Sequence, residues 1–296
     1  MLMRVEQLTH TIIALGEGPV WNGEAGKLFY TDITGCTLYE YDPVSEENRV
    51  YWKGNMQVGG FAFARSGGCV LCTDRGIFLL DENGSTGENM FPSLVLRQGE
   101  RFNDITTGPC GRIYGGTMYR HLGENDGILY RLEKGKDPVK LLEGLGTSNG
   151  MSFTMDEKTF FHTDSRQRTI TSYDYNRFTG DIEHPRTFFA GEEQWGSPDG
   201  HTIDTDDTLW VAFWGGSCIR KVDNTGSVID KIDTPAGQTS SVMFGGEDLT
   251  DLYITSASSG ALNSESGMDK EGNFLGGYLY RIRNAGQGRA EWKAGF

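Results

Sequence analysis

The segment LFYTDITGCTLYEYDP, residues 28–43, decides the fold, because its pattern returns along the whole chain. It reads as a short apolar strand, a small polar break, a second strand that ends in aromatic residues, and a turn. Five further copies follow, and they begin at Cys69, Arg112, Thr159, Leu209 and Leu252. Self-similarity at a period of about 40 to 50 residues is the sequence signature of a repeat architecture.

Each copy follows another short strand and a tight turn, as in GMSFTMDEK at 150–158 and HTIDTDDT at 201–208. A unit therefore holds about four strands, which is the size of one propeller blade. No segment carries the apolar stripe of an amphipathic helix. The sequence predicts an all-β fold: one six-bladed β-propeller domain over residues 1–296, whose N- and C-terminal segments share the closing blade. A pair of β-sandwiches is the alternative architecture.

The composition excludes several classes of protein. The chain has 296 residues with 42 Gly, 16 Phe, 12 Tyr and 6 Trp. The glycines follow no Gly-X-Y period, and so many aromatic residues argue against disorder. No apolar run approaches the roughly 18 residues of a membrane-spanning helix. The net charge is −14, from 27 basic and 41 acidic residues, and the basic residues are scattered. We therefore expect no nucleic-acid partner and no membrane partner.

The cysteine pattern favours buried, reduced thiols. There are five cysteines, an odd and sparse set. Cys69 and Cys72 form a C-x-x-C motif, but it lies in a strand-like run with no second pair and no neighbouring His. The N-terminal stretch has no secretory-signal pattern. The sequence therefore predicts a cytoplasmic protein.

Oxygen-bearing side chains recur at the start of the first strand of the repeat. In a propeller this strand lines the central channel. Four of the six units place Glu17, Asn103, Asn149 and Asp199 there. Rotational pseudo-symmetry would bring these distant residues together at one mouth of the channel. A set of oxygen ligands without Cys or His suits a hard cation such as Ca²⁺, Mg²⁺ or Mn²⁺. Taken singly, each motif also fits a simple turn.

Five motifs resemble the successive motifs of the SMP-30/gluconolactonase/regucalcin family, in order from about residue 15 to residue 281. They are GEGPVW (16–21), RFNDITTGPCGRIYGGTM (101–118), TSNGMSFTMDEKTFFHTDS (147–165), SPDGHTIDTDDTLWVAFWGG (197–216) and TSSVMFGG (239–246). The resemblance implies a six-bladed propeller with one divalent cation in its channel. It implies that Glu17, Asn149 and Asp199 hold the cation, and that Arg101 and Asn103 contact the substrate.

The chain departs from the family after the G-T-M motif. Some relatives place a carboxylate there that binds substrate hydroxyls, whereas this chain has Tyr119, Arg120 and His121. We expect Tyr119 and His121 to contact the substrate instead. Together with Arg101 and His201, which is predicted to approach the channel mouth, they suggest a substrate that carries an anionic group.

The remaining candidate residues have two interpretations each. Arg101 either orients the substrate or forms a structural salt bridge at the channel rim. Trp195 and Trp214 either stack on a sugar ring or pack between blades. Asp104 is interpreted as a turn residue beside Asn103. His162 is predicted to be a buried histidine with its hydrogen bonds satisfied.

Members of the family are mostly sugar-acid lactonases, and some relatives cleave organophosphates. We therefore expect a divalent-metal-dependent hydrolase that opens a sugar lactone to the free acid in carbohydrate catabolism. In this hypothesis a cation polarises the carbonyl, and Asp199 is both ligand and catalytic base. Ca²⁺ is the expected cation, and Zn²⁺, Mn²⁺, Mg²⁺ and Fe²⁺ are compatible. The alternatives are a phosphotriesterase or fluorophosphatase, and a calcium-binding propeller without catalysis. No oligomeric state follows from the sequence.

Overall fold

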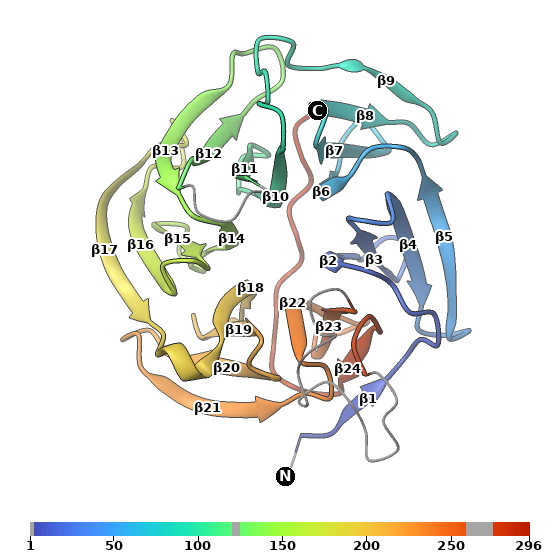
Figure 1. Ribbon diagram of the computed structural model, residues 1–296, viewed down its shortest axis with the longest axis vertical. Helices are drawn as coiled ribbons and strands as arrows, with labels where there is room; N and C mark the ends of the chain where they lie inside the picture. The colour runs from blue at the N-terminus through green and yellow to red at the C-terminus, as the bar shows by residue number, and fades with distance from the viewer. Residues whose placement is uncertain (1–2, 120–124, 259–274) are drawn as a thin grey trace.

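The computed structural model describes residues 3–119, 125–258 and 275–296. Within these ranges the chain is almost entirely β-structure, apart from one 3-10 turn at Glu193–Trp195. No helix in them is long and apolar enough to cross a membrane. Figure 1 shows the sheets arranged around a common centre. The prediction of an all-β, propeller-like fold is confirmed.

Four of the sheets have four strands each, paired in chain order. The first contains β2 (Gly16–Asn22), β3 (Lys27–Asp32), β4 (Thr37–Asp42) and β5 (Glu47–Lys53). The second contains β6 (Val58–Phe63), β7 (Cys69–Thr73), β8 (Ile77–Leu80) and β9 (Thr86–Asn89). The third contains β10 (Glu100–Thr107), β11 (Ile113–Tyr119), β12 (Gly127–Leu132) and β13 (Val139–Leu145). The fourth contains β14 (Ser148–Phe153), β15 (Thr159–Asp164), β16 (Thr169–Tyr175) and β17 (Ile182–Ala190).

The fifth sheet has eight strands in two runs of four. One run is β18 (Ser197–Ile203), β19 (Leu209–Trp214), β20 (Cys218–Val222) and β21 (Val228–Asp233). The other is β22 (Gln238–Gly245), β23 (Asp251–Ala257), β24 (Tyr280–Ile282) and β1 (Val5–Gln7). The runs join because Trp214 at the end of β19 pairs with Gln238 at the start of β22. The sequence predicts six separate sheets, whereas the pairing gives five.

The innermost strands contact one another in a closed ring. β2 touches β6 and β22, and the contacts continue through β10, β14 and β18 back to β22 (Figure 1). A closed ring leaves no inner sheet edge exposed. It also brings the starts of strands that are far apart in sequence to one end of the axis.

Each innermost strand carries a register irregularity at a corresponding point. Asn103 is the extra residue between Phe102 and Asp104, and Gly150 is the extra residue between Asn149 and Met151. The other inner strands have the same interruption, between Glu17 and Val20, Val58 and Gly60, Pro198 and His201, and Thr239 and Ser241. A bulge of this kind turns a side chain away from the regular alternation. The bulges therefore govern where the candidate site residues point.

Two glycines allow the inner strands to approach closely. A Cβ on Gly150 would lie 2.6 Å from the carbonyl oxygen of Asp199, on the next inner strand. A Cβ on Gly200 would lie 2.1 Å from Oγ of Ser241, again one strand further round. Any larger residue would push the ring apart at the level of the candidate site.

The chain beyond β24 crosses the molecule, a feature that the sequence did not predict. Residues 283–296 pass over the centre of the view in Figure 1 and end beside β6 and β8. Ala294 N donates to the Phe63 carbonyl oxygen at 2.8 Å, and Gly295 N donates to the Gly111 carbonyl oxygen at 2.8 Å. Phe296 is 3% exposed and belongs to a core cluster with residues of β6–β8 and β10–β12. This C-terminal tail thus ties opposite sides of the ring together.

Candidate functional site

A cavity of about 790 Å³ lies at the starts of the innermost strands. It brings together every described residue that the motifs assigned to the site: Glu17, Arg101, Asn103, Tyr119, Asn149 and Asp199. His121, the remaining candidate, lies outside the described residues. Residues that come from four different sheets therefore converge on one cavity.

The cavity contains buried negative charge. Glu17 is 6% exposed and Asp199 is 4% exposed. Burial is the first cause of the raised pKa of Glu17, followed by repulsion from Asp199 and then from Asp104. Burial and then Asp104 also raise the pKa of Asp199, while the Arg101 guanidinium opposes the shift. Several carboxyl groups thus compete for a low-dielectric region with one nearby positive charge.

The residues fit a divalent cation. Oδ1 of Asp199 is buried and has no hydrogen-bond partner among the described residues. Oε2 of Glu17 accepts one long bond, 3.4 Å from Gly18 N. A buried carboxylate without partners is costly unless a cation compensates it. Two carboxylates and the amide oxygen of Asn149 form the oxygen-rich set that Ca²⁺ or Mg²⁺ prefers. Because the third member is an amide, no group of three His, Cys, Asp or Glu side chains forms a metal cluster in the described chain.

A ladder of hydrogen bonds links the candidate substrate and cation ligands. Nη1 of Arg101 donates to Oδ1 of Asn103 at 2.6 Å. Nδ2 of Asn103 then donates to Oδ1 of Asn149 at 2.8 Å and to the Ser148 carbonyl oxygen at 2.8 Å. Nδ2 of Asn149 in turn donates to Oγ of Ser165 at 2.7 Å. The sequence motifs did not single out Ser165, because its role depends on the partner strand.

Arg101 is held inside the cavity. Its side chain is buried, and Nη1 also donates to the Phe102 carbonyl oxygen at 2.9 Å. These two bonds fix one edge of the guanidinium plane. The geometry supports an orienting role, since an anchored fork of N–H donors presents a defined face to the cavity.

The two strand histidines are buried and neutral. Nε2 of His162 lies 2.7 Å from Oγ of Ser148, so the prediction of a satisfied buried histidine is confirmed. Burial lowers its pKa to about 4. His201 lies within 3.0 Å of the hydroxyls of Ser152 and Thr163, and burial lowers its pKa to about 3. The prediction that His201 approaches the site mouth is wrong, because the bulge at 198–201 turns it to the other side of the strand end.

The structure separates the two tryptophans. Trp214 lines the site cavity. Trp195 instead stacks on Phe189, with ring centroids 6.3 Å apart, and the Arg220 guanidinium lies 4.1 Å from its ring centroid. Trp195 is therefore a packing residue, and Trp214 is the one of the pair that is placed to meet a ligand.

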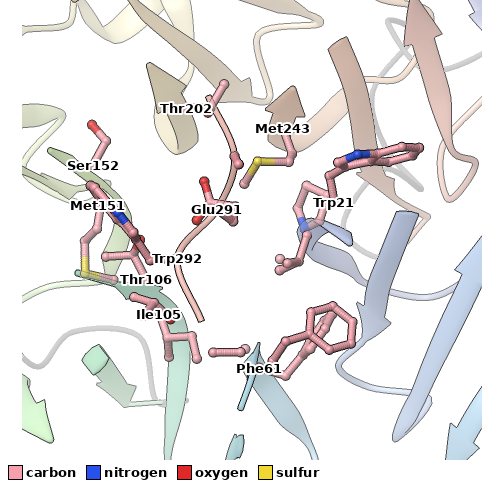
Figure 2. Close-up of a pocket in the computed structure, with 18 of the residues that line it drawn as sticks. Trp21, Phe61, Ile105, Thr106, Met151, Ser152, Thr202, Met243, Glu291 and Trp292 are labelled. Atoms are coloured by element: carbon pink, nitrogen blue, oxygen red, sulfur yellow. The ribbon is translucent and has the colours of Figure 1, made fainter. Parts of the chain in front are cut away.

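A second, smaller cavity of about 270 Å³ lies further along the same inner strands. Figure 2 shows Glu291 and Trp292 of the C-terminal tail among Trp21, Phe61 and Met243 there. Asp104 also lines this cavity, and its charge acts on both Glu17 and Asp199. Burial raises the pKa of Asp104 to about 7. Asp104 is thus part of the channel, and the interpretation as a simple turn residue is wrong.

The chain is similar to known proteins over almost its whole length. Residues 15–258 match the model of the SMP-30/gluconolactonase/LRE-like region. The chain is 32% identical to pentonolactonase XacC of Haloferax volcanii over 292 residues, which cover 99% of this chain and 98% of that protein. It is 33% identical to regucalcin of Gallus gallus over 263 residues, which cover 87% and 85%. The solved structure of a luciferin-regenerating enzyme matches with a TM-score of 0.89 at 29% identity, covering 99% of this chain and 100% of that one. The chain therefore belongs to the SMP-30/gluconolactonase/LRE-like family, as its motifs predicted.

Proposed function

We propose that this protein is a divalent-metal-dependent lactonase that opens a sugar-acid lactone to the free acid. The observation that carries the proposal is the unpaired, buried Oδ1 of Asp199 beside Glu17 and Asn149, in one cavity with Arg101 and Asn103. The similarity to a pentonolactonase along nearly the full chain supports the substrate class and a carboxylic-ester hydrolase activity. Lactone opening of this kind belongs to carbohydrate catabolism, and five unpaired cysteines suit the cytoplasm.

Glu17, Asn149 and Asp199 would hold the cation. When bound, it supplies Lewis-acid polarisation of the lactone carbonyl. Ca²⁺ is our first candidate, because the ligands are all oxygen atoms and a regucalcin is among the relatives. Zn²⁺, Mn²⁺, Mg²⁺ and Fe²⁺ are compatible with the same ligands.

Asp199 acts as the base in this proposal. A water oxygen bonds to the lactone carbonyl carbon, and its proton passes to the Asp199 carboxylate. The bond between that carbon and the ring oxygen then breaks, and the ring oxygen takes up the proton and leaves as a hydroxyl. Arg101 and Asn103 orient the polar groups of the substrate, and Tyr119 and His121 contact it from the loop after β11.

We also propose that residues 1–296 form one domain with six blades. The two runs of the eight-stranded sheet each contain four strands in meander order, and a single residue pair joins them. Counting each run as a blade gives six, one for each inner strand of the closed ring. The pairing of β1 with β24 supports a closing blade that both ends of the chain share.

A substrate panel tests the proposal. Aldonolactones of both ring sizes, a phosphotriester and a fluorophosphate are offered to the purified protein in Ca²⁺, and acid release is followed by pH-stat titration. We expect turnover of at least one aldonolactone and little turnover of the phosphorus esters, since the cavity is lined by polar groups that match hydroxyls. Turnover of the phosphorus esters alone, or tight Ca²⁺ binding without any turnover, would contradict the proposal.

A further inference from the structure

The hydrogen-bond ladder of the site ends on Ser165, which no motif assigned. Oγ of Ser165 lies 2.7 Å from Nδ2 of Asn149. Ser165 is 9% exposed and lines the same cavity as Glu17 and Asp199. A hydroxyl can accept a bond from an amide NH₂ group or donate one to an amide oxygen. Ser165 therefore holds Asn149 whichever way the amide faces.

The backbone around Ser165 is itself fixed. Asp164 is buried, and its Oδ1 accepts bonds from the backbone N–H groups of Thr147 at 3.2 Å and Arg166 at 3.1 Å. Its Oδ2 accepts a bond from Gly146 N at 2.9 Å, and Ser165 N donates to the Thr147 carbonyl oxygen at 3.0 Å. The turn that carries Ser165 is thus bound to the residues that lead directly into Asn149. The hydroxyl and the amide cannot drift apart without breaking several bonds.

Asn149 needs this support more than the carboxylates do. An amide binds a cation through one of its two terminal atoms, whereas either oxygen of a carboxylate can serve. The terminal torsion of Asn is broad, so its orientation depends on its partners. Asn103 holds the amide from one side at 2.8 Å, and Ser165 holds it from the other.

We propose that Ser165 is a positioning residue for the cation: it fixes the amide of Asn149 and thereby sets the affinity of the site for a divalent ion. The inference rests on the proposed cation site, and it concerns binding rather than the chemistry of the lactone. Partners of metal ligands typically contribute 10- to 100-fold to metal affinity. Their loss acts on affinity because the ligand then spends less time in the binding orientation.

The test is calorimetric titration of the chelated, full-length protein with Ca²⁺ alone. We expect Ser165→Ala to weaken Ca²⁺ binding roughly 10- to 100-fold, and Ser165→Thr, which keeps the hydroxyl, to restore most of the affinity. The calcium concentration that gives half-maximal lactone turnover should rise by the same factor as the dissociation constant. The matched control is Ser172→Ala on β16, a buried serine whose Oγ donates to the Arg186 carbonyl oxygen at 3.4 Å, outside the cavity.

The outcomes separate this inference from the proposed function. If Ser165→Ala binds Ca²⁺ as tightly as the wild type, or if Ser172→Ala loses as much affinity at equal thermal stability, the positioning role is wrong. If the wild type binds Ca²⁺ and Ser165→Ala does not, the role stands even when no lactone is hydrolysed. A wild type that binds no divalent cation overturns both.

Discussion

Trp195 and Trp214 stand close in sequence, but their surroundings give them different roles. We expect Trp214→Ala to raise KM for the lactone about tenfold, which corresponds to about 1.4 kcal/mol, with a smaller change in kcat. The reason is that the indole lines the cavity, where it can cover the apolar face of a sugar ring. Steady-state kinetics on the best aldonolactone measures the effect.

Trp195→Ala is the matched control for this prediction. Its ring packs on Phe189 and Arg220 rather than in the cavity. It should lower the thermal midpoint and leave KM near the wild-type value. A KM that rises equally in both variants would show that Trp214 acts through the fold.

At the scale of single residues, the sequence located those whose chemistry repeats in phase. Glu17, Asn149 and Asp199 could be found because each occupies the same point of a repeat, and they do line one cavity. Ser165 could not be found, since a hydroxyl becomes informative only when its partner on another strand is known. His201 was misplaced because the bulge beside it changes which way the strand presents its side chains.

The bulges of the inner strands are the elements that build the site. Gly200, in the bulge of β18, packs against β22, and its Cβ would lie 2.5 Å from the Cβ of Ser241. We expect Gly200→Ala to lower the free energy of unfolding by about 1–3 kcal/mol, the usual cost of overpacking. Urea denaturation measures it.

The control is Gly87→Ala on β9, where an added Cβ would meet nothing within 4 Å. This variant should unfold at the wild-type urea concentration or slightly above it, since alanine restricts the unfolded chain. Equal stability of the two variants would mean that the inner strands have room to separate.

A buried histidine on β15 gives the fold a pH dependence. The pKa of His162 is lowered from its ordinary value of 6.5 to about 4 by burial. The unfolded chain therefore takes up a proton at a higher pH than the folded protein does. Stability is fully present above about pH 6.5 and falls as the pH drops toward 4, by about 2 kcal/mol at pH 5 for this one group.

The replacement His162→Gln removes that titration while leaving a polar group near Ser148. We expect the difference in unfolding free energy between pH 7 and pH 5 to shrink by about 2 kcal/mol relative to the wild type. Urea titrations of both proteins at the two pH values give the comparison. An unchanged difference would mean that His162 is protonated in the folded protein.

Strand boundaries and the repeat could be predicted at this scale, but the bulges could not. Alternation of apolar and polar residues defines a strand, and turn residues define its ends. A bulge such as Gly150 depends on register against the partner strand, to which one sequence gives no direct access. The site geometry depends on those bulges, so the sequence gave its members without their directions.

The C-terminal tail stabilises the molecule as a whole. Phe296 is 3% exposed and packs against Phe91, with ring centroids 6.0 Å apart. We expect Phe296→Ala to lower the free energy of unfolding by about 3–5 kcal/mol, as for other buried Phe residues. Phe178→Ala, at a site that is 84% exposed, should have almost no effect. If urea denaturation finds both variants equal to the wild type, the tail does not hold the ring together.

The overall architecture followed from the period of the repeat, and two features did not. The tail after β24 has no strand pattern and no copy elsewhere in the chain, so nothing in residues 283–296 indicated that they cross the axis. The joining of two four-stranded runs depends on one contact, between Trp214 and Gln238, which depends on how closely neighbouring sheets approach.

The most direct test of the account is the dependence of lactone hydrolysis on the cation. The initial rate on an aldonolactone is measured for the wild type after chelation, during titration with Ca²⁺, and for Asp199→Asn at saturating Ca²⁺. We predict that chelation abolishes turnover, that Ca²⁺ restores it, and that Asp199→Asn stays roughly 10²- to 10⁴-fold slower. Full turnover in the chelated protein, or a wild-type rate from Asp199→Asn, would contradict the account.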